Sequence, residues 1–257
     1  MNLSIKILTV LVFYSFSVFT QSIKGKVRTD NIYSNHLKDI RTIHTYFSTK
    51  NKHKGKEIFL FCTDGQELMK MNYINSIDSL IENKIIIPIN LILVESNEKY
   101  VNKDLQMRNW EYVKGYNKTM FANHLLFFTK ELPLFFKKKY NIIFNDTSNL
   151  FFGCSNGAGF GLTLSAIDNS LIKDYILFSE CGGDLGSIDS LNVNENKYDI
   201  YWGRNEVSPL KTSTLEKSII LIENGNEVRL KEFIGGHNNK IWKKEFLEYL
   251  VSNFPYE

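Results

Sequence analysis

The sequence predicts an α/β protein in which a mostly parallel central sheet is covered by helices on both faces. Short apolar runs typical of buried strands alternate along the chain with stretches of helical periodicity. In addition, the pentapeptide Gly153-Cys154-Ser155-Asn156-Gly157 directly follows an apolar run and precedes a small, apolar helix candidate. A strand, a sharp turn with a central serine and a helix form the pattern of a nucleophile elbow, so this context adds weight to a short motif.

Length and composition indicate one large domain. The chain has 257 residues, of which 43% are hydrophobic and 23% charged, so it can bury a sizeable core. Its net charge of +3 is too mild to indicate a nucleic-acid partner. The lysine-rich runs 50–56 and 137–139 are expected to be solvated surface, because no aromatic residues interleave them.

The amino terminus resembles a signal peptide. Lys6 precedes the largely apolar stretch 7–19, and polar residues follow at 20–22. The stretch is shorter than the roughly 20 residues that a membrane span needs. We therefore expect a signal peptide at 1–22, a domain at 23–257, export to the periplasm or the medium, and no integral span after signal removal. The cleavage point and the oligomeric state stay open.

Elements are predicted in chain order from apolar periodicity and turn residues. An antiparallel pair is expected at 31–39 and 40–48, because apolar and polar residues alternate in the second segment. Strands of the parallel part are expected at 57–62, 90–94, 148–152, 175–178, 198–202 and 228–234. Helices are expected at 76–83, 120–139, 158–167, 210–224 and 241–253. Pro133 should kink or divide the long helix, and 108–118 is expected to be a polar, aromatic loop.

Three cysteines, Cys62, Cys154 and Cys181, each follow an apolar run. Their odd number excludes complete pairing within one chain. We expect three buried thiols that act as small apolar residues. The chain has no C-x-x-C or H-E-x-x-H spacing, so no metal site is expected.

A serine nucleophile needs a base, and His237 is the candidate. It follows the last predicted strand, after Gly235-Gly236, and so falls on the same edge of the sheet as Ser155. Structural or surface roles are expected for the other four histidines, which all precede the elbow: His36, His44, His53 and His124.

The acid that orients the histidine should lie between Ser155 and His237, at the end of a strand. Glu206, just beyond the strand at 198–202, is preferred, although a surface glutamate fits its pattern equally well. The other candidates are Glu180, Asp184, Asp199 and Glu223.

Acyl transfer also needs hydrogen-bond donors for an oxyanion. One should be the backbone N–H of Asn156, at the start of the elbow helix. The other should be the backbone N–H of Gln66, with Gly65 supplying the turn after the strand at 57–62. The alternative for Asp64-Gly65 is a simple tight turn.

Taken together, these motifs resemble those of an α/β-hydrolase family that includes enterochelin (siderophore) esterases, feruloyl and acetyl xylan esterases, S-formylglutathione hydrolases and mycolyltransferases. The resemblance covers roughly residues 25–253. It rests on the motifs already described, together with Arg108-x-x-Glu111-Tyr112, Glu131-Leu132-Pro133 and Trp242. The sequence departs from the family pattern at Asn238, where aspartate is common, and at Ala158, which replaces a second glycine.

The resemblance implies an α/β-hydrolase fold without a large lid and a serine esterase that needs no cofactor. It implies Ser155 as nucleophile, His237 as base and Glu206 as acid, although some members work with a serine–histidine dyad. Arg108 and Glu111 are expected to form an ion pair that shapes the rim of the site with Asp64 and Gly65. Siderophore-type and carbohydrate-linked esters are both open as substrates. A non-catalytic ligand-binding protein and an acyltransferase to a sugar are the alternatives.

Overall fold

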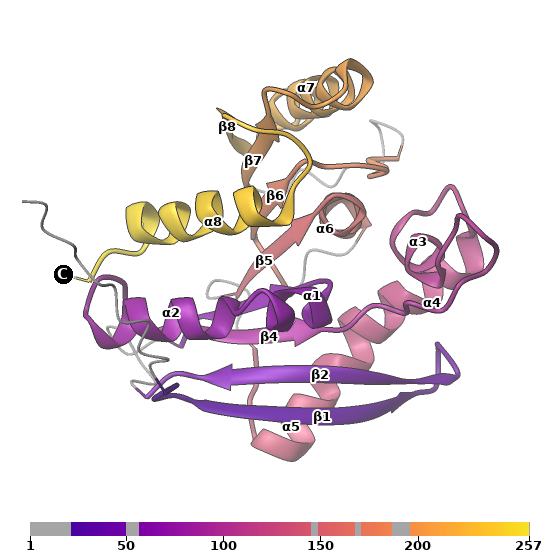
Figure 1. Ribbon diagram of the computed structural model, residues 1–257. Helices are drawn as coiled ribbons and strands as arrows, with labels where there is room; N and C mark the ends of the chain where they lie inside the picture. The colour runs from indigo at the N-terminus through magenta and orange to yellow at the C-terminus, as the bar shows by residue number, and fades with distance from the viewer. Residues whose placement is uncertain (1–21, 50–56, 145–148, 168–170, 187–195, 257) are drawn as a thin grey trace, which may run out of the picture.

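The protein is described by a computed structural model covering residues 22–49, 57–144, 149–167, 171–186 and 196–256. The predicted signal segment therefore lies outside the described residues, apart from Ser22. A mixed sheet runs through the molecule (Figure 1). It has eight strands in the order β1-β2-β4-β3-β5-β6-β7-β8. Its strands are β1 (Lys26–Ser34), β2 (Asp39–Phe47), β3 (Phe59–Cys62), β4 (Asn90–Val94), β5 (Asn149–Cys154), β6 (Asp174–Phe178), β7 (Lys197–Gly203) and β8 (Glu227–Phe233).

The strands from β4 to β8 run parallel, whereas β2 is antiparallel to both β1 and β4. This arrangement confirms the predicted sheet. The helices are α1 (Gly65–Lys70), α2 (Tyr73–Glu82), α3 (Met107–Tyr112), α4 (Lys118–Leu126), the π-helical η1 (Phe127–Glu131), α5 (Leu132–Tyr140), α6 (Asn156–Ile167), α7 (Ser208–Glu223) and α8 (Asn239–Asn253).

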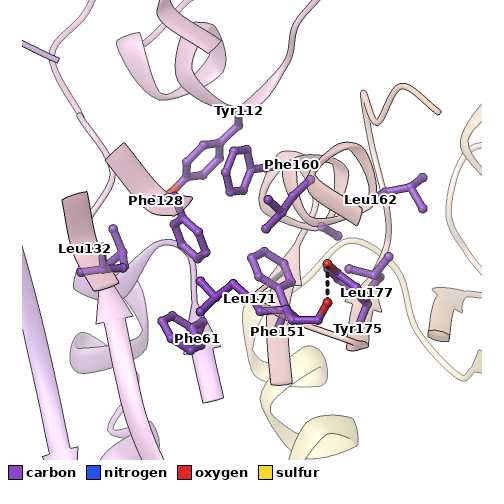
Figure 2. Packing of buried hydrophobic residues seen from close by; sticks show 14 of the residues in the cluster. Phe61, Tyr112, Phe128, Leu132, Phe151, Phe160, Leu162, Leu171, Tyr175 and Leu177 are labelled. Atoms are coloured by element: carbon purple, nitrogen blue, oxygen red, sulfur yellow. Dashed lines mark hydrogen bonds between the residues drawn. The ribbon is translucent and has the colours of Figure 1, made fainter. Parts of the chain in front are cut away.

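Two apolar cores form because alternate residues of the central strands point to opposite faces of the sheet. One core joins Phe61 and Phe151 to side chains of α4, η1, α5 and α6 (Figure 2). The other joins Leu60 and Phe152 to side chains of α1, α2 and α8. Helices therefore cover both faces, as predicted. No helix among the described residues is long and apolar enough to cross a membrane.

Several predicted boundaries are wrong. The opening strands begin earlier than expected, at Lys26 and Asp39, and pair in register from Lys26 with Phe47 to Ser34 with Asp39. The predicted helix 120–139 is divided into three consecutive segments, with the π-helical turn η1 directly before α5 and Pro133 in the first turn of α5, so the expected division near Pro133 is confirmed. The predicted loop 108–118 contains most of α3, and the short helix α1 was not anticipated.

The carboxyl ends of the parallel strands meet at one edge of the sheet. Asp64 follows β3, Ser155 follows β5, Glu206 lies three residues beyond β7, and His237 lies four residues beyond β8. In open α/β sheets this edge is where ligands bind, so the topology gathers the candidate residues in the expected place.

Candidate active site

Ser155 lies at the apex of a sharp turn between β5 and α6. Its φ of 55° is left-handed, a costly conformation for a residue with a Cβ atom. The Ser155 N–H donates to the carbonyl of Phe178 on β6 at 2.9 Å, which holds the turn against the neighbouring strand. The chain approaches itself closely here: a Cβ added to Gly153 would lie 2.6 Å from the carbonyl carbon of Gly157. These are the features of a nucleophile elbow.

His237 lies beside the serine. Its Nε2 is 2.9 Å from Ser155 Oγ, although the two residues are 82 positions apart in the chain. Gly235 has a φ of 149°, which L side chains rarely adopt, and its carbonyl accepts from the N–H of Asn205 at 2.8 Å. The β8–α8 loop is therefore tied to the β7–α7 loop, which carries Glu206.

Glu206 faces the other nitrogen of the imidazole. Its Oε1 lies 3.3 Å from His237 Nδ1, and neither carboxylate oxygen has a well-aligned hydrogen-bond donor among the described residues. The Glu206 side chain is 1% exposed and that of His237 is 43% exposed. Burial alone raises the pKa of Glu206, but His237 and Ser179 beside it bring that pKa below its usual value. The carboxylate is thus suited to orient an imidazole and to stabilise its charged form.

Trp242 of α8 supports the histidine from another side. The rings of Trp242 and His237 meet edge to face with their centroids 4.6 Å apart. The indole Nε1–H donates to Ser179 Oγ at 2.8 Å. Ser179 has a left-handed φ of 52° and follows β6. No sequence signal pointed to Ser179, because an isolated serine after a strand has no distinctive pattern.

The two predicted oxyanion donors lie near the start of their helices. Asn156 is the first residue of α6, and Gln66 is the second residue of α1, so neither backbone N–H has a carbonyl one turn earlier in its helix. The Gln66 side chain is fixed to Ser96, donating from Nε2 to Oγ at 2.6 Å and accepting the Ser96 N–H at 3.0 Å. Gly65 packs on β4, where an added Cβ would lie 2.8 Å from the carbonyl carbon of Leu93.

The expected ion pair between Arg108 and Glu111 is wrong. Arg108 instead forms a two-pronged pair with Asp64, Nε to Oδ1 at 2.5 Å and Nη2 to Oδ2 at 2.7 Å. Glu111 is fully buried and pairs with Arg41 of β2 at 2.6 Å. The two residues diverge because positions three apart on a short helix reach different neighbours, and sequence alone does not reveal which opposite charge each one meets.

A cavity of about 370 Å³ opens onto Ser155 and His237. One part of its lining is apolar and includes Leu68, Met71, Tyr73, Phe152 and Trp242, while the rest is polar and includes Asp64, Gln66, Glu67, Glu98, Gln106, Arg108 and Asn239. Glu111 is not among the lining residues. A larger hollow of about 980 Å³ lies beside β1 and α5, and its described lining contains neither histidine nor cysteine.

The expectation of three buried thiols is correct for Cys62, which is buried, but wrong for Cys181, which is exposed. Cys154 is half-buried, and all three are free. Cys181 lies beyond the end of β6, outside the sheet that would bury it.

Three of the other histidines lie away from Ser155. His124 is fully buried among aromatic rings, His44 contacts Glu95 at 2.7 Å, and His36 is half-buried within the β1–β2 turn. His53 is outside the described residues.

The sheet order, the strand–turn–helix at Ser155 and the position of His237 after the last strand define an α/β-hydrolase fold, and comparison with solved structures supports this class. A CE1 ferulic acid esterase from Anaeromyces mucronatus, in complex with ferulic acid, superimposes with a TM-score of 0.68 and 16% identity, over 89% of this chain and 90% of that one. The BES protein from Bacillus cereus gives a TM-score of 0.71 and 13% identity, over 97% of this chain and 98% of that one.

The enterobactin esterase FES from Shigella flexneri, in the presence of enterobactin, gives a TM-score of 0.71 and 14% identity, and the match covers 90% of this chain. The chain spans only 59% of the length of that enzyme. No protein-family model matches the sequence. No curated protein matches it either. At these low identities the likeness concerns the fold.

Proposed function

We propose that the protein is a serine hydrolase of carboxylic esters. The observation that carries the proposal is the 2.9 Å contact between Ser155 Oγ and His237 Nε2, two residues that line a cavity. A serine at a strained turn that faces an imidazole, which in turn faces a buried carboxylate, is the arrangement that activates a hydroxyl for acyl transfer.

In the proposed reaction, Ser155 Oγ attacks the ester carbonyl carbon while its proton passes to His237 Nε2. The carbonyl oxygen becomes an oxyanion held by the backbone N–H groups of Asn156 and Gln66. The bond to the alcohol oxygen breaks, and the alcohol leaves with the proton from His237. Water then attacks the acyl carbon and gives a proton to the same imidazole. The bond from the acyl carbon to Ser155 Oγ breaks, the imidazolium returns the proton to Oγ, and the acid is released. Glu206 stabilises the imidazolium in both halves of the reaction.

We propose siderophore-type or carbohydrate-linked esters as the substrates. The structural neighbours include an enterobactin esterase and a ferulic acid esterase, and the cavity offers both an apolar and a polar side. Comparing kcat/KM for the two kinds of ester decides between them. The proposal loses its support if simple alkyl esters are turned over better than both.

We also propose that the protein is exported, from the composition of residues 1–22. Sequencing the amino terminus of protein recovered outside the cytoplasm tests this. Recovery of the full chain beginning at Met1, confined to the cytoplasm, would contradict it.

Hydrolysis of short-chain p-nitrophenyl esters by the protein without residues 1–22 tests the reaction class. The wild type should turn over, and Ser155→Ala should lose activity by about 10⁴-fold or more while staying folded. Ser165→Ala is the matched control, since Ser165 is on the same helix and contacts Leu162 and Tyr198. A Ser155→Ala variant that keeps wild-type activity would contradict the proposal.

A further inference from the structure

The turn that precedes α1 is strained and tightly held. Asp64 has φ 56° and ψ 43°, a left-handed conformation that persists in a residue with a Cβ only where the surroundings enforce it. The next residue, Gly65, is so close to the backbone of Leu93 that a Cβ atom would not fit. The position of the Gln66 N–H therefore depends on what holds Asp64.

One short helix holds Asp64 at both its backbone and its side chain. The N–H of Asp64 donates to Tyr112 Oη at 3.2 Å. The Asp64 carboxylate accepts the two-pronged pair from Arg108, four residues earlier on α3. Because residues four apart share a helix face, the Arg108 guanidinium also lies over the Tyr112 ring, 5.0 Å from its centroid.

The same tyrosine packs against the elbow helix. Tyr112 is fully buried, and its ring lies beside that of Phe160 on α6 (Figure 2), with the ring centroids 5.6 Å apart. The start of α6 also approaches the turn directly: a Cβ added to Gly157 would lie 2.3 Å from Thr63 Oγ1 and 3.0 Å from Asp64 Oδ2. Tyr112 thus contacts both structural units that carry the proposed oxyanion donors.

We propose that Tyr112, together with Arg108, is a positioning residue that holds the Asp64–Gln66 turn at a fixed distance from the elbow helix. This inference rests on the proposed esterase function. The Tyr112 hydroxyl accepts the N–H of the strained Asp64 residue, and the Tyr112 ring packs between that residue and α6. Arg108 holds the Asp64 side chain through the two-pronged pair. The N–H groups of Gln66 and Asn156 are thereby aligned with the oxygen that becomes charged in the transition state.

The same contacts define the role of Arg108, whose side chain lines the cavity. Nε and Nη2 of Arg108 both donate to the Asp64 carboxylate. Because this carboxylate already balances the charge of the guanidinium, Arg108 is a poor receptor for a second anion. Arg108 therefore acts on the turn and does not bind an anionic group of the substrate. Its loss should affect neutral and anionic esters equally.

Steady-state kinetics of Tyr112→Phe test the positioning role, because this variant keeps the ring and removes the hydroxyl. We expect kcat to fall by about tenfold to a hundredfold with KM changed by less than about twofold, since a misplaced donor matters mainly in the transition state. A trifluoromethyl ketone, which forms a tetrahedral adduct with the serine, should bind more weakly by the same factor as the loss in kcat/KM.

Tyr198→Phe is the matched control. Tyr198 is also buried and its hydroxyl donates to Ser165 at 2.8 Å, away from the turn. It should keep kcat within about twofold of the wild type.

Substitution of Arg108 by lysine tests the role of the Arg108–Asp64 pair. Arg108→Lys should lower kcat for a neutral ester and for a carboxylate-bearing ester by the same factor. Arg229 forms a similar two-pronged pair with Asp199. Arg229→Lys is therefore the control and should leave kcat unchanged. A loss in Arg108→Lys confined to the KM of the anionic ester would overturn the assignment.

The outcomes separate the two proposals. An active Tyr112→Phe variant with wild-type kcat and wild-type affinity for the ketone overturns the positioning role and leaves the esterase proposal standing. A folded wild-type protein that hydrolyses no ester and forms no adduct with the ketone overturns both. The inference stands if kcat and ketone affinity fall together in Tyr112→Phe but not in Tyr198→Phe.

Discussion

Ser155, His237 and Glu206 come from three separate loops, and each of the three is held by its own backbone contacts. The serine turn is tied to β6 through Phe178, whereas the histidine loop is tied through Gly235 to the loop that carries the glutamate. The geometry at the residue scale therefore depends on the ends of neighbouring parallel strands. The Glu206 side chain is buried and is not among the described residues that line the cavity, so we expect it to affect rate more than substrate binding.

Glu206→Gln should lower kcat by up to about 10⁴-fold with little change in KM, because the amide cannot stabilise the imidazolium. Ester hydrolysis under saturating conditions measures the effect. Glu180→Gln is a control of similar burial, because Glu180 pairs with Lys217 and the N–H of Gly183. A loss of less than tenfold in Glu206→Gln would indicate a serine–histidine dyad.

The lowered pKa of Glu206 also predicts a pH dependence of stability. A carboxyl with a folded-state pKa below its unfolded value, about 4.3, stabilises the protein above that pH and loses the contribution as pH falls through the folded pKa. Thermal unfolding from pH 6 downward should show the wild type losing stability relative to Glu206→Gln below about pH 4.3. Glu216→Gln, on the exposed side of α7, is the control. Wild-type and Glu206→Gln curves that stay parallel through this range would contradict the prediction.

At the scale of elements, the start of α6 fits between its own strand and the turn after β3. A Cβ added to Gly153 would lie within 3 Å of the backbone of Gly157 and Ala158, whereas one added to Gly115 would meet nothing within 4 Å. Gly153→Ala should therefore destabilise the protein by about 1–3 kcal/mol and abolish most activity. Denaturant unfolding measures this. Equal denaturant midpoints for Gly153→Ala and Gly115→Ala would contradict this, because the turn at Ser155 would then accommodate the added methyl group without loss of stability.

The sequence was informative where a pattern repeats along an element. Apolar runs predicted the parallel strands, and a serine between glycines predicted the elbow. The predicted boundaries are wrong where tertiary packing decides them. In α3, for example, Arg108 and Tyr112 were predicted to lie in a polar loop. The predicted partner of a buried charge was wrong for the same reason: Glu111 pairs with Arg41, which lies 70 positions away in the chain. A one-dimensional pattern does not encode which distant charge a buried carboxylate will face.

At the scale of the whole molecule, the parallel part of the sheet accounts for the site. Because β3 to β8 run in one direction, the Asp64 turn, Ser155, Glu206 and His237 all lie beyond carboxyl ends of strands at one edge. The antiparallel β1 and β2 extend the sheet beyond β4, and β2 contributes Arg41, which anchors α3 through Glu111. The likeness to the solved structures at 13–16% identity concerns this sheet and its helices.

Covalent trapping tests the central claim most directly. A fluorophosphonate reacts much faster with a serine activated by a neighbouring base than with an ordinary serine, so intact mass followed by peptide mapping identifies the nucleophile. We predict one adduct per chain, on Ser155, with labelling slowed by orders of magnitude in a folded His237→Ala variant. No adduct, or an adduct on another serine that forms equally fast without His237, would contradict the account.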